Sequence, residues 1–338
     1  MTNQLKMDVK TQRKVHKANG ISRQISVLTG NSNPELAKAI GKHLGIPLAH
    51  AQVDRFPEGE IRVQIQDNIR GKDVFIIQST CSPPNRHLME LLILIDAARR
   101  ASASRITAVL PFYGYARQDR KDKPRVPITA KLVANLLVSA GANRILALDL
   151  HSGQIQGFFD IPVDHLYSIN VFSKYFINKR LKNLVVVSPD VGGIKQARAY
   201  STVLEAPLAI VDKRRESATQ TKAMNIIGEV KNRNVVLVDD MISTAGSLVE
   251  AVHVLKENGC LDVYAAIVHP ILVGPAIERI QKLELKELVV SDSIPLPPEK
   301  RIKKITVLSV ASLLGEAIKR IHENASVSYL FQKSAVEA

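Results

Sequence analysis

The chain contains the stretch Val-Leu-Val-Asp-Asp-Met-Ile-Ser-Thr-Ala-Gly-Ser at residues 236–247. Its first three residues are apolar and mostly β-branched, which is typical of a strand buried on both faces of a parallel sheet. The hydroxyl and glycine residues at its end favour the start of a helix. The stretch therefore predicts a buried strand that leads directly into a helix, which is the repeating unit of an α/β fold.

The same junction has the chemistry of a sugar-phosphate site. Asp239 and Asp240 offer two adjacent carboxylates that can bind neighbouring hydroxyl groups of a sugar. The N–H groups and the positive dipole end of a helix that begins within residues 243–247 suit a phosphate group. Ribose 5-phosphate carries both features, and we interpret the stretch as a site for it. The alternative is an N-capped helix without a ligand.

Similar apolar runs alternate with helical patterns along the rest of the chain, which predicts parallel sheets with helices on both faces. The expected strands cover residues 25–28, 74–78, 106–110, 145–148, 184–187, 208–211, 235–238 and 263–268. The expected helices cover residues 33–44, 87–100, 129–139, 170–178, 248–258 and 313–322.

The chain of 338 residues is long enough for two domains. Residues 74–112 and 235–270 follow the same order of strand, polar loop, helix and strand, which indicates two copies of one α/β unit. A proline within residues 161–164 marks the expected seam, so we expect an N-terminal domain over residues 21–165 and a C-terminal domain over residues 166–338. Residues 1–20 are basic and lack an apolar core, and we interpret them as a disordered tail.

The composition narrows the class of protein. The formal net charge is +14, which fits nucleic acid, an anionic membrane surface or a highly anionic small substrate. No helix-turn-helix pattern or basic stripe with interleaved aromatic residues is evident, so a nucleic-acid-binding regulator is the least favoured of these. No apolar run reaches about 18 residues, and no membrane span is expected. Cys81 and Cys260 are the only cysteines, which indicates a reducing compartment, the cytoplasm.

Polar residues follow several of the expected strands. Ligands of open parallel sheets lie beyond the carboxyl ends of the strands, so we expect these residues to line a site. Asp149 and His151 follow one strand, and Asp190 follows the next. His151 and Asp190 are candidate ligands for a divalent metal, and a phosphate substrate with oxygen-rich surroundings favours magnesium. The alternative is a histidine that only bonds to a backbone carbonyl.

Two basic loops also follow strands, at residues 113–125 and 212–215. Both are too highly charged to pack in a core, and we interpret them as loops that close over a polyphosphate. A solvated charged surface is the alternative.

Taken together, these motifs resemble class I ribose-phosphate diphosphokinases, also called phosphoribosyl pyrophosphate synthetases. The resemblance extends from about residue 25 to residue 331. It depends on residues 31–37, 55–60, 113–121, 127–131, 149–151, 154–159, 188–190 and 239–247. It implies two tandem phosphoribosyltransferase-like domains and a transferase of nucleotide biosynthesis. Such an enzyme transfers the β,γ-diphosphoryl group of MgATP to the 1-hydroxyl of ribose 5-phosphate, giving phosphoribosyl pyrophosphate and AMP.

The resemblance also implies roles for individual residues and a hexamer with sites shared between subunits. The ATP-binding residues would be Phe56, Glu58 and Glu60, supplied by a neighbouring subunit, with Arg117 and Gln118. Catalysis would depend on Lys213, Arg215 and Arg117. Ribose 5-phosphate would be bound by Asp239, Asp240, Ser243, Thr244, Ala245, Gly246 and Ser247, and magnesium by His151 and Asp190.

The sequence departs from the family pattern at a few positions. Ser243 stands where the sugar-phosphate loop of the family commonly has aspartate, and Ser247 stands where it has threonine. Glu58 replaces a common aspartate, and Val191 replaces a histidine of many bacterial members. The missing carboxylate at Ser243 keeps open the alternative of a non-catalytic companion subunit that regulates such an enzyme. The intact basic loops favour catalysis.

Overall fold

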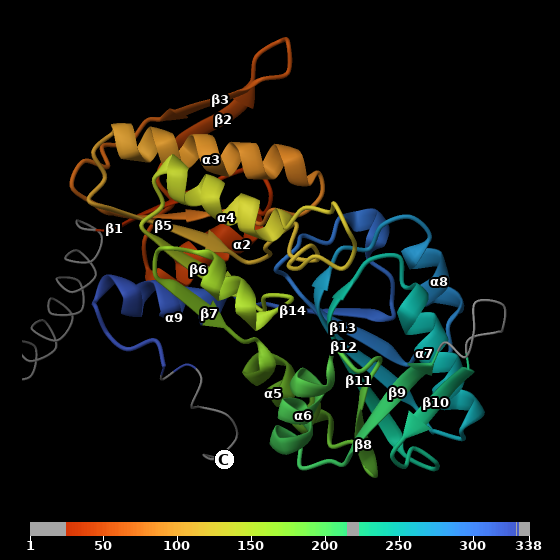
Figure 1. The fold of residues 1–338 in the computed structure, drawn as a ribbon. Helices are drawn as coiled ribbons and strands as arrows, with labels where there is room; N and C mark the ends of the chain where they lie inside the picture. Colours follow the sequence, from red (N-terminus) through yellow and green to blue (C-terminus); the bar gives the residue numbers. More distant parts are fainter. Residues whose placement is uncertain (1–24, 215–222, 329, 331–338) are drawn as a thin grey trace, which may run out of the picture. The chain divides into compact units, whose positions relative to one another are not determined.

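A computed structural model describes residues 25–214, 223–328 and 330 of the chain (Figure 1). Within these ranges the chain divides into two compact units. The first unit contains the residues up to 166 and those from 311 to 330, and the second contains residues 167–310. The expected tail over residues 1–20 lies outside the described residues.

The first unit is built on a sheet of five parallel strands in the order β1-β4-β5-β6-β7. These are β1 (Ile25–Thr29), β4 (Asp73–Ile77), β5 (Arg105–Leu110), β6 (Arg144–Leu148) and β7 (Val163–Leu166). Strand β4 is buried at all five positions, as its continuous apolar run predicts. All five carboxyl ends therefore lie at the same edge of the sheet.

Helices cover both faces of this sheet (Figure 1). Helices α3 (Pro84–Arg100) and α4 (Thr129–Ala140) share one apolar core with it. Helices α2 (Pro34–Leu44) and α9 (Ala311–His322) pack against each other on the other face. The antiparallel hairpin of β2 (Ala51–Arg55) and β3 (Ile61–Ile65) extends beyond the sheet.

Helix α9 belongs to the first unit although it follows the last strand of the second unit in the chain. The expected domain boundary put this segment with residues 166–338. Two contacts hold the helix to the first sheet: Arg105 Nη2 donates to the carbonyl oxygen of Ile321 at 2.9 Å, and His322 Nδ1 lies 2.9 Å from Asp73 Oδ2. An amphipathic pattern shows that a helix has an apolar face, but it does not show which sheet covers that face.

The second unit is built on a seven-stranded sheet in the order β10-β9-β8-β11-β12-β13-β14. Only the pair β9 and β10 is antiparallel among these strands. The strands are β8 (Leu184–Ser188), β9 (Leu208–Arg214), β10 (Ala223–Ile227), β11 (Asn234–Ile242), β12 (Val263–Pro270), β13 (Glu287–Ser291) and β14 (Ile305–Leu308). Helices α7 (Gly246–Glu257) and α8 (Ala276–Lys282) lie on one face, and α5 (Ile169–Lys179) and α6 (Ile194–Val203) lie on the other (Figure 1).

The predicted α/β class with parallel sheets and helices on both faces is confirmed, and each expected strand is present. The structure also contains strands that the sequence interpretation missed, namely β2, β3, β7, β10, β13 and β14. The residues of β2 and β3 are at most half-buried, so they lack the continuous apolar run that marked the others. No helix in the described part of the chain is long and apolar enough to cross a membrane.

Candidate functional site

The two predicted sugar-binding carboxylates lie at the carboxyl end of β11. Four buried residues precede them in the strand, and Asp239 and Asp240 themselves are half-buried. Burial and the neighbouring carboxyl group of Asp240 hold the pKa of Asp239 well above its ordinary value. Two adjacent carboxyl groups at this position can bind neighbouring hydroxyl groups of a sugar.

The loop after β11 turns sharply into α7. Ala245 adopts a left-handed conformation with φ 61° and ψ 11°, and helix α7 begins at Gly246. Its N-cap residue, Ala245, makes no side-chain hydrogen bond to the helix, and its first turn contains no acidic residue. Thr244 and Ser247 are exposed beside it. Because the first N–H groups of a helix lack partners within the helix, this turn can bind an anion.

The strand end at β8 presents Asp190. Its Oδ1 atom accepts hydrogen bonds from the backbone N–H groups of Gly192 at 2.8 Å and Gly193 at 3.0 Å. These bonds fix the carboxylate group while the residue stays exposed. A fixed and exposed carboxylate suits a hard cation.

In the first unit, the predicted residue His151 is exposed after β6. The preceding residues are held firmly: Asp149 N–H donates to the Leu166 carbonyl at 2.9 Å, and Leu150 N–H donates to His165 Nε2 at 2.9 Å. Asp149 has a positive φ of 38°, which L residues rarely adopt. His165 thus supports the loop that presents His151, a role that sequence reasoning missed because no local pattern links β7 to this loop.

The loop between β5 and α4 contains Arg117 and Gln118, both exposed. The Gln118 carbonyl accepts a hydrogen bond from Ala130 N–H at 3.2 Å, and the Thr129 hydroxyl group donates to the Gln118 side-chain oxygen. The start of α4 therefore anchors this basic loop at Gln118.

Phe56, Glu58 and Glu60 lie away from the sheet edge, at the exposed turn of the β2–β3 hairpin (Figure 1). The Phe56 ring is 41% exposed, and the Arg62 guanidinium group lies 5.6 Å from its centroid. An exposed aromatic ring beside a cation offers a stacking surface for a flat ligand.

Lys213 belongs to β9, where its backbone pairs with Met224 of β10. Arg215 lies outside the described residues. The predicted metal ligands fall in different units, His151 in the first and Asp190 in the second. In the described ranges, no group of three or more His, Cys, Asp or Glu side chains is arranged to hold a metal ion.

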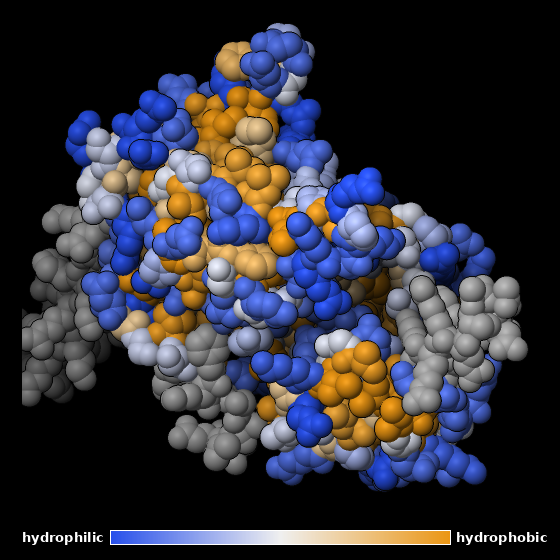
Figure 2. All heavy atoms as spheres, viewed as in Figure 1, coloured by the Kyte–Doolittle hydropathy of each residue, from blue (hydrophilic) through white to orange (hydrophobic). Residues whose placement is uncertain are grey.

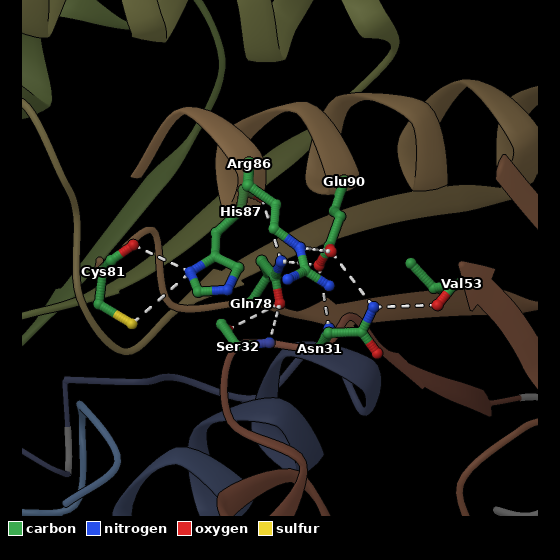
Figure 3. A network of polar contacts seen from close by, with 8 residues as sticks. All are labelled: Asn31, Ser32, Val53, Gln78, Cys81, Arg86, His87 and Glu90. Atoms are coloured by element: carbon green, nitrogen blue, oxygen red, sulfur yellow. Dashed lines mark hydrogen bonds and ion pairs between the residues drawn. The ribbon is translucent and has the colours of Figure 1, made fainter. Parts of the chain in front are cut away.

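A buried polar network fills the carboxyl end of β1 and β4 in the first unit (Figure 3). The Gln78 side-chain oxygen accepts from Ser32 N–H at 3.2 Å and from Ser32 Oγ at 2.7 Å, and its nitrogen donates to the His87 carbonyl at 3.1 Å and to Glu90 Oε2 at 3.0 Å. Arg86 Nε donates to Glu90 Oε1 at 2.9 Å. This part of the edge is therefore occupied by side chains that satisfy one another.

The Glu90 carboxylate is stabilised by this network. Burial acts to raise its pKa, but the hydrogen bonds from Asn31, Gln78 and Arg86 outweigh burial, so the pKa of Glu90 lies below its ordinary value. The ionised Glu90 carboxylate is therefore held inside the unit by Asn31 and Gln78 and paired with the Arg86 cation.

Apolar side chains are exposed on α3 and α4 of the first unit. Met89 is 48% exposed, Leu132 54% and Leu136 39%. Figure 2 shows apolar surface over the region of these helices. Contiguous apolar surface of this kind favours contact with another protein chain.

Comparison with known proteins gives consistent matches. Two protein-family models match the chain. The family of the N-terminal domain of ribose phosphate pyrophosphokinase matches residues 25–141, and the family of the phosphoribosyl synthetase-associated domain matches residues 214–332. Ribose-phosphate pyrophosphokinase of Chlorobaculum tepidum is 58% identical over 313 residues, covering 92% of this chain and 96% of that protein. The corresponding protein of Bacillus subtilis is 53% identical over 309 residues, covering 91% and 98%.

A solved structure is similar over nearly the same length. The crystal structure of phosphoribosylpyrophosphate synthetase from Mycobacterium smegmatis matches with a TM-score of 0.85 and 42% identity, covering 89% of this chain and 100% of that one.

Proposed function

The chain belongs to the ribose-phosphate pyrophosphokinase family, and from that premise we propose how its two units divide the reaction between them. It is an ATP-dependent diphosphotransferase that transfers the β,γ-diphosphoryl group of ATP to the 1-hydroxyl of ribose 5-phosphate, giving phosphoribosyl pyrophosphate and AMP. The second unit would hold the sugar phosphate, and the first would supply groups that bind ATP.

The sugar-phosphate assignment depends chiefly on the junction of β11 and α7. Asp239 and Asp240 would bind the ring hydroxyl groups. The uncapped start of α7, with Ser243, Thr244, Ala245, Gly246 and Ser247, would bind the 5-phosphate. The left-handed Ala245 supports this, since successive N–H groups in such a turn form a concave anion site.

Arg117 and Gln118 would bind the phosphates and ribose of ATP in the first unit. The adenine of ATP bound to a neighbouring subunit would be held by Phe56, Glu58 and Glu60. These residues lie at the exposed turn of a hairpin that extends beyond the five-stranded sheet of its unit. The apolar surface on α3 and α4 also supports an oligomer, and we propose a hexamer with shared sites.

In the first unit, His151 is the candidate contact for magnesium bound to the phosphate oxygens of ATP, and in the second unit the candidate contact is Asp190. The exposed carboxylate of Asp190 fits a hard cation that takes most of its ligands from substrate and water, and the exposed imidazole of His151 offers a nitrogen ligand. Bound magnesium supplies charge neutralisation on the phosphate oxygens.

Catalysis would depend on positioning and on cations. Attack of the 1-hydroxyl oxygen on the β-phosphorus increases the negative charge on the transferred group and on the departing AMP. Lys213, Arg215 and Arg117 would stabilise that charge, and no covalent intermediate on the protein is needed. The protein would act in the cytoplasm, where both substrates are present.

A steady-state assay of AMP formation from ATP and ribose 5-phosphate with magnesium tests the proposed division. We expect Arg117→Ala to raise the KM for ATP and Ser247→Ala to raise the KM for ribose 5-phosphate, each about tenfold and with a smaller effect on the other substrate. Arg100→Ala is the matched control, because Arg100 is an exposed arginine of α3 that pairs only with Asp96 at 2.7 Å among its described partners. Failure of the parent protein to form AMP would favour the companion-subunit alternative. Equal effects of Arg117→Ala and Ser247→Ala on both substrates would refute the division between units.

A further inference from the structure

The backbone of the sugar-phosphate loop is held by a residue from a different element. Arg279, in helix α8, donates a hydrogen bond from Nη1 to the carbonyl oxygen of Thr244 at 2.9 Å. The two residues are 35 positions apart in the chain. The guanidinium group also passes close to the start of α7, since a Cβ atom placed on Gly246 would lie 3.6 Å from Nη1.

This bond completes a row of contacts along one side of the loop. The carbonyl oxygen of Ile242 accepts from Leu272 N–H at 3.1 Å, and that of Ser243 accepts from Val273 N–H at 3.0 Å. The Thr244 carbonyl follows in the same stretch, and no further backbone N–H meets it in the described residues, so the Arg279 side chain takes that place. Three consecutive carbonyl groups are thereby fixed.

The orientation of the Thr244 carbonyl determines the orientation of the next N–H group. The peptide bond is planar and trans, so the N–H of Ala245 points opposite to the carbonyl oxygen of Thr244. Because Arg279 draws the oxygen towards α8, the Ala245 N–H is directed to the opposite side of the loop. That N–H and those of the first residues of α7 are the donors that would bind a phosphate.

Ala245 needs such support. Its φ of 61° and ψ of 11° lie in the left-handed region, which disfavours any residue with a β-carbon. Alanine has no side-chain hydrogen bond that could offset this preference. Helix α8 gives Arg279 a fixed position from which to hold the peptide, since Ala276 and Ile280 anchor the helix in the core and have no exposed surface.

We propose that Arg279 is a positioning residue that keeps the Thr244–Ala245 peptide in its anion-binding orientation and thereby sets the affinity for the 5-phosphate of ribose 5-phosphate. The proposal rests on the assignment of residues 239–247 to ribose 5-phosphate. Arg279 acts through the backbone of the loop, and its effect is therefore confined to binding of the sugar phosphate.

The test measures KM and kcat for both substrates in the full-length protein. Arg279→Ala is expected to raise the KM for ribose 5-phosphate about tenfold, the loss that corresponds to one charge-assisted hydrogen bond. The KM for ATP and kcat are expected to change by less than about twofold. Lys282→Ala is the matched control, because Lys282 is an exposed cation on the same helix and bonds to Glu278 at 2.6 Å. Its kinetic parameters should equal those of the parent.

A second substitution separates positioning from a simple effect of charge. Glycine adopts the left-handed conformation without a β-carbon penalty. We therefore measure the loss of affinity for ribose 5-phosphate that Arg279→Ala causes in two backgrounds, the parent and Ala245→Gly. In the Ala245→Gly background this loss should be at most about half of the loss in the parent. If Arg279 acted only through its positive charge, the double variant would bind as weakly as Arg279→Ala alone, and the proposal would be overturned.

The remaining outcomes are also decisive. An unchanged KM for ribose 5-phosphate in folded Arg279→Ala overturns the proposal. If Ser247→Ala raises that KM while Arg279→Ala does not, the proposal fails and the site assignment stands; if neither variant changes it, the site assignment itself fails. Should Arg279→Ala not fold, Arg279→Lys replaces it, with a rise of about threefold expected, because lysine keeps one donor but loses the planar fork. An Arg279→Lys variant with parental affinity would then count against the proposal.

Discussion

Replacing Gly30 with alanine would force a side chain into the buried network at the edge of the first sheet. A Cβ atom on Gly30 would lie 2.5 Å from Gln78 Oε1 and 2.7 Å from Gln78 Nε2, far inside van der Waals contact. Gln78 has no exposed surface and its amide group makes four hydrogen bonds, so it can move away only by breaking them. The backbone of Gly30 does not itself require glycine, because its φ lies outside the left-handed range.

The magnitude follows from the bonds that the amide group would lose. It makes three neutral hydrogen bonds, two from Ser32 and one to the His87 carbonyl, and one bond to the Glu90 carboxylate. A neutral bond contributes about 1 kcal/mol and one to a charged group about 2 kcal/mol, while buried partners left without a bond cost more. The lower entropy of unfolded alanine returns up to about 1 kcal/mol. We expect Gly30→Ala to lower the free energy of unfolding by about 3–5 kcal/mol.

Thermal unfolding of the full-length protein checks this value. For a unit of this size the loss corresponds to a fall in Tm of at least about 6 °C. Gly153→Ala is the matched control, because a Cβ atom there meets nothing within 4 Å, and its Tm should stay near that of the parent. Gln78→Ala combined with Gly30→Ala should be no less stable than Gln78→Ala alone, since the clash disappears with the amide group. A Gly30→Ala Tm within about 2 °C of the parent, or strictly additive losses in the double variant, would refute the reasoning.

Four further outcomes are expected. Lys213→Ala should lower kcat about a hundredfold or more with smaller changes in either KM and an unchanged Tm, in a steady-state assay; full activity would remove Lys213 from the mechanism. Ser243→Asp should lower the KM for ribose 5-phosphate or raise kcat, with ATP parameters less affected, whereas a neutral result would show that this departure has no functional weight. His151→Ala should reduce activity at limiting magnesium and recover partly in excess magnesium, because Asp190 and the ATP phosphates still offer oxygen ligands; an unaltered magnesium titration would show that His151 has no role in metal binding. Because the pKa of Glu90 is lowered in the folded protein, its contribution to stability is fully present above the unfolded pKa of about 4.3 and is lost as the pH falls through the folded value. The free energies of unfolding of the parent and Glu90→Gln, measured in urea, should therefore differ at pH 7 and converge in acid. A difference that stays constant with pH would contradict this.

Most of the fold could be predicted because its signals are local. The runs that became β4, β8 and β11 are continuous and β-branched, and a strand buried on both faces leaves that mark in the sequence whatever surrounds it. The hairpin of β2 and β3 escaped prediction because its residues are at most half-buried. Strand β13 has a shorter apolar run between charged neighbours, and its pairing with β12 and β14 makes it a strand.

The residues of the candidate site were also predicted only in part. Asp190, Asp239 and Asp240 were evident from the sequence as polar residues that follow buried apolar runs, because parallel strands bring their carboxyl ends to one edge. The structure differs in one respect, since β11 continues to Ile242 and contains Asp239 and Asp240. The supporting residues were not evident. His165 and Arg279 stand in segments without a motif, and each supports the site through a hydrogen bond to a backbone group of another loop.

By itself, the sequence determined the α/β class, the order of the main strands and helices and the chemistry at the strand ends, because periodicity and composition act over a few neighbouring residues. Only the tertiary structure decided that α9 returns to the first unit, that Gly30 must lack a side chain beside Gln78 and that Arg279 holds the Thr244 carbonyl. Each of these depends on two segments that are distant in the chain and adjacent in space. Such contacts are selected by the packing of the whole unit, which leaves no period or motif in the local sequence.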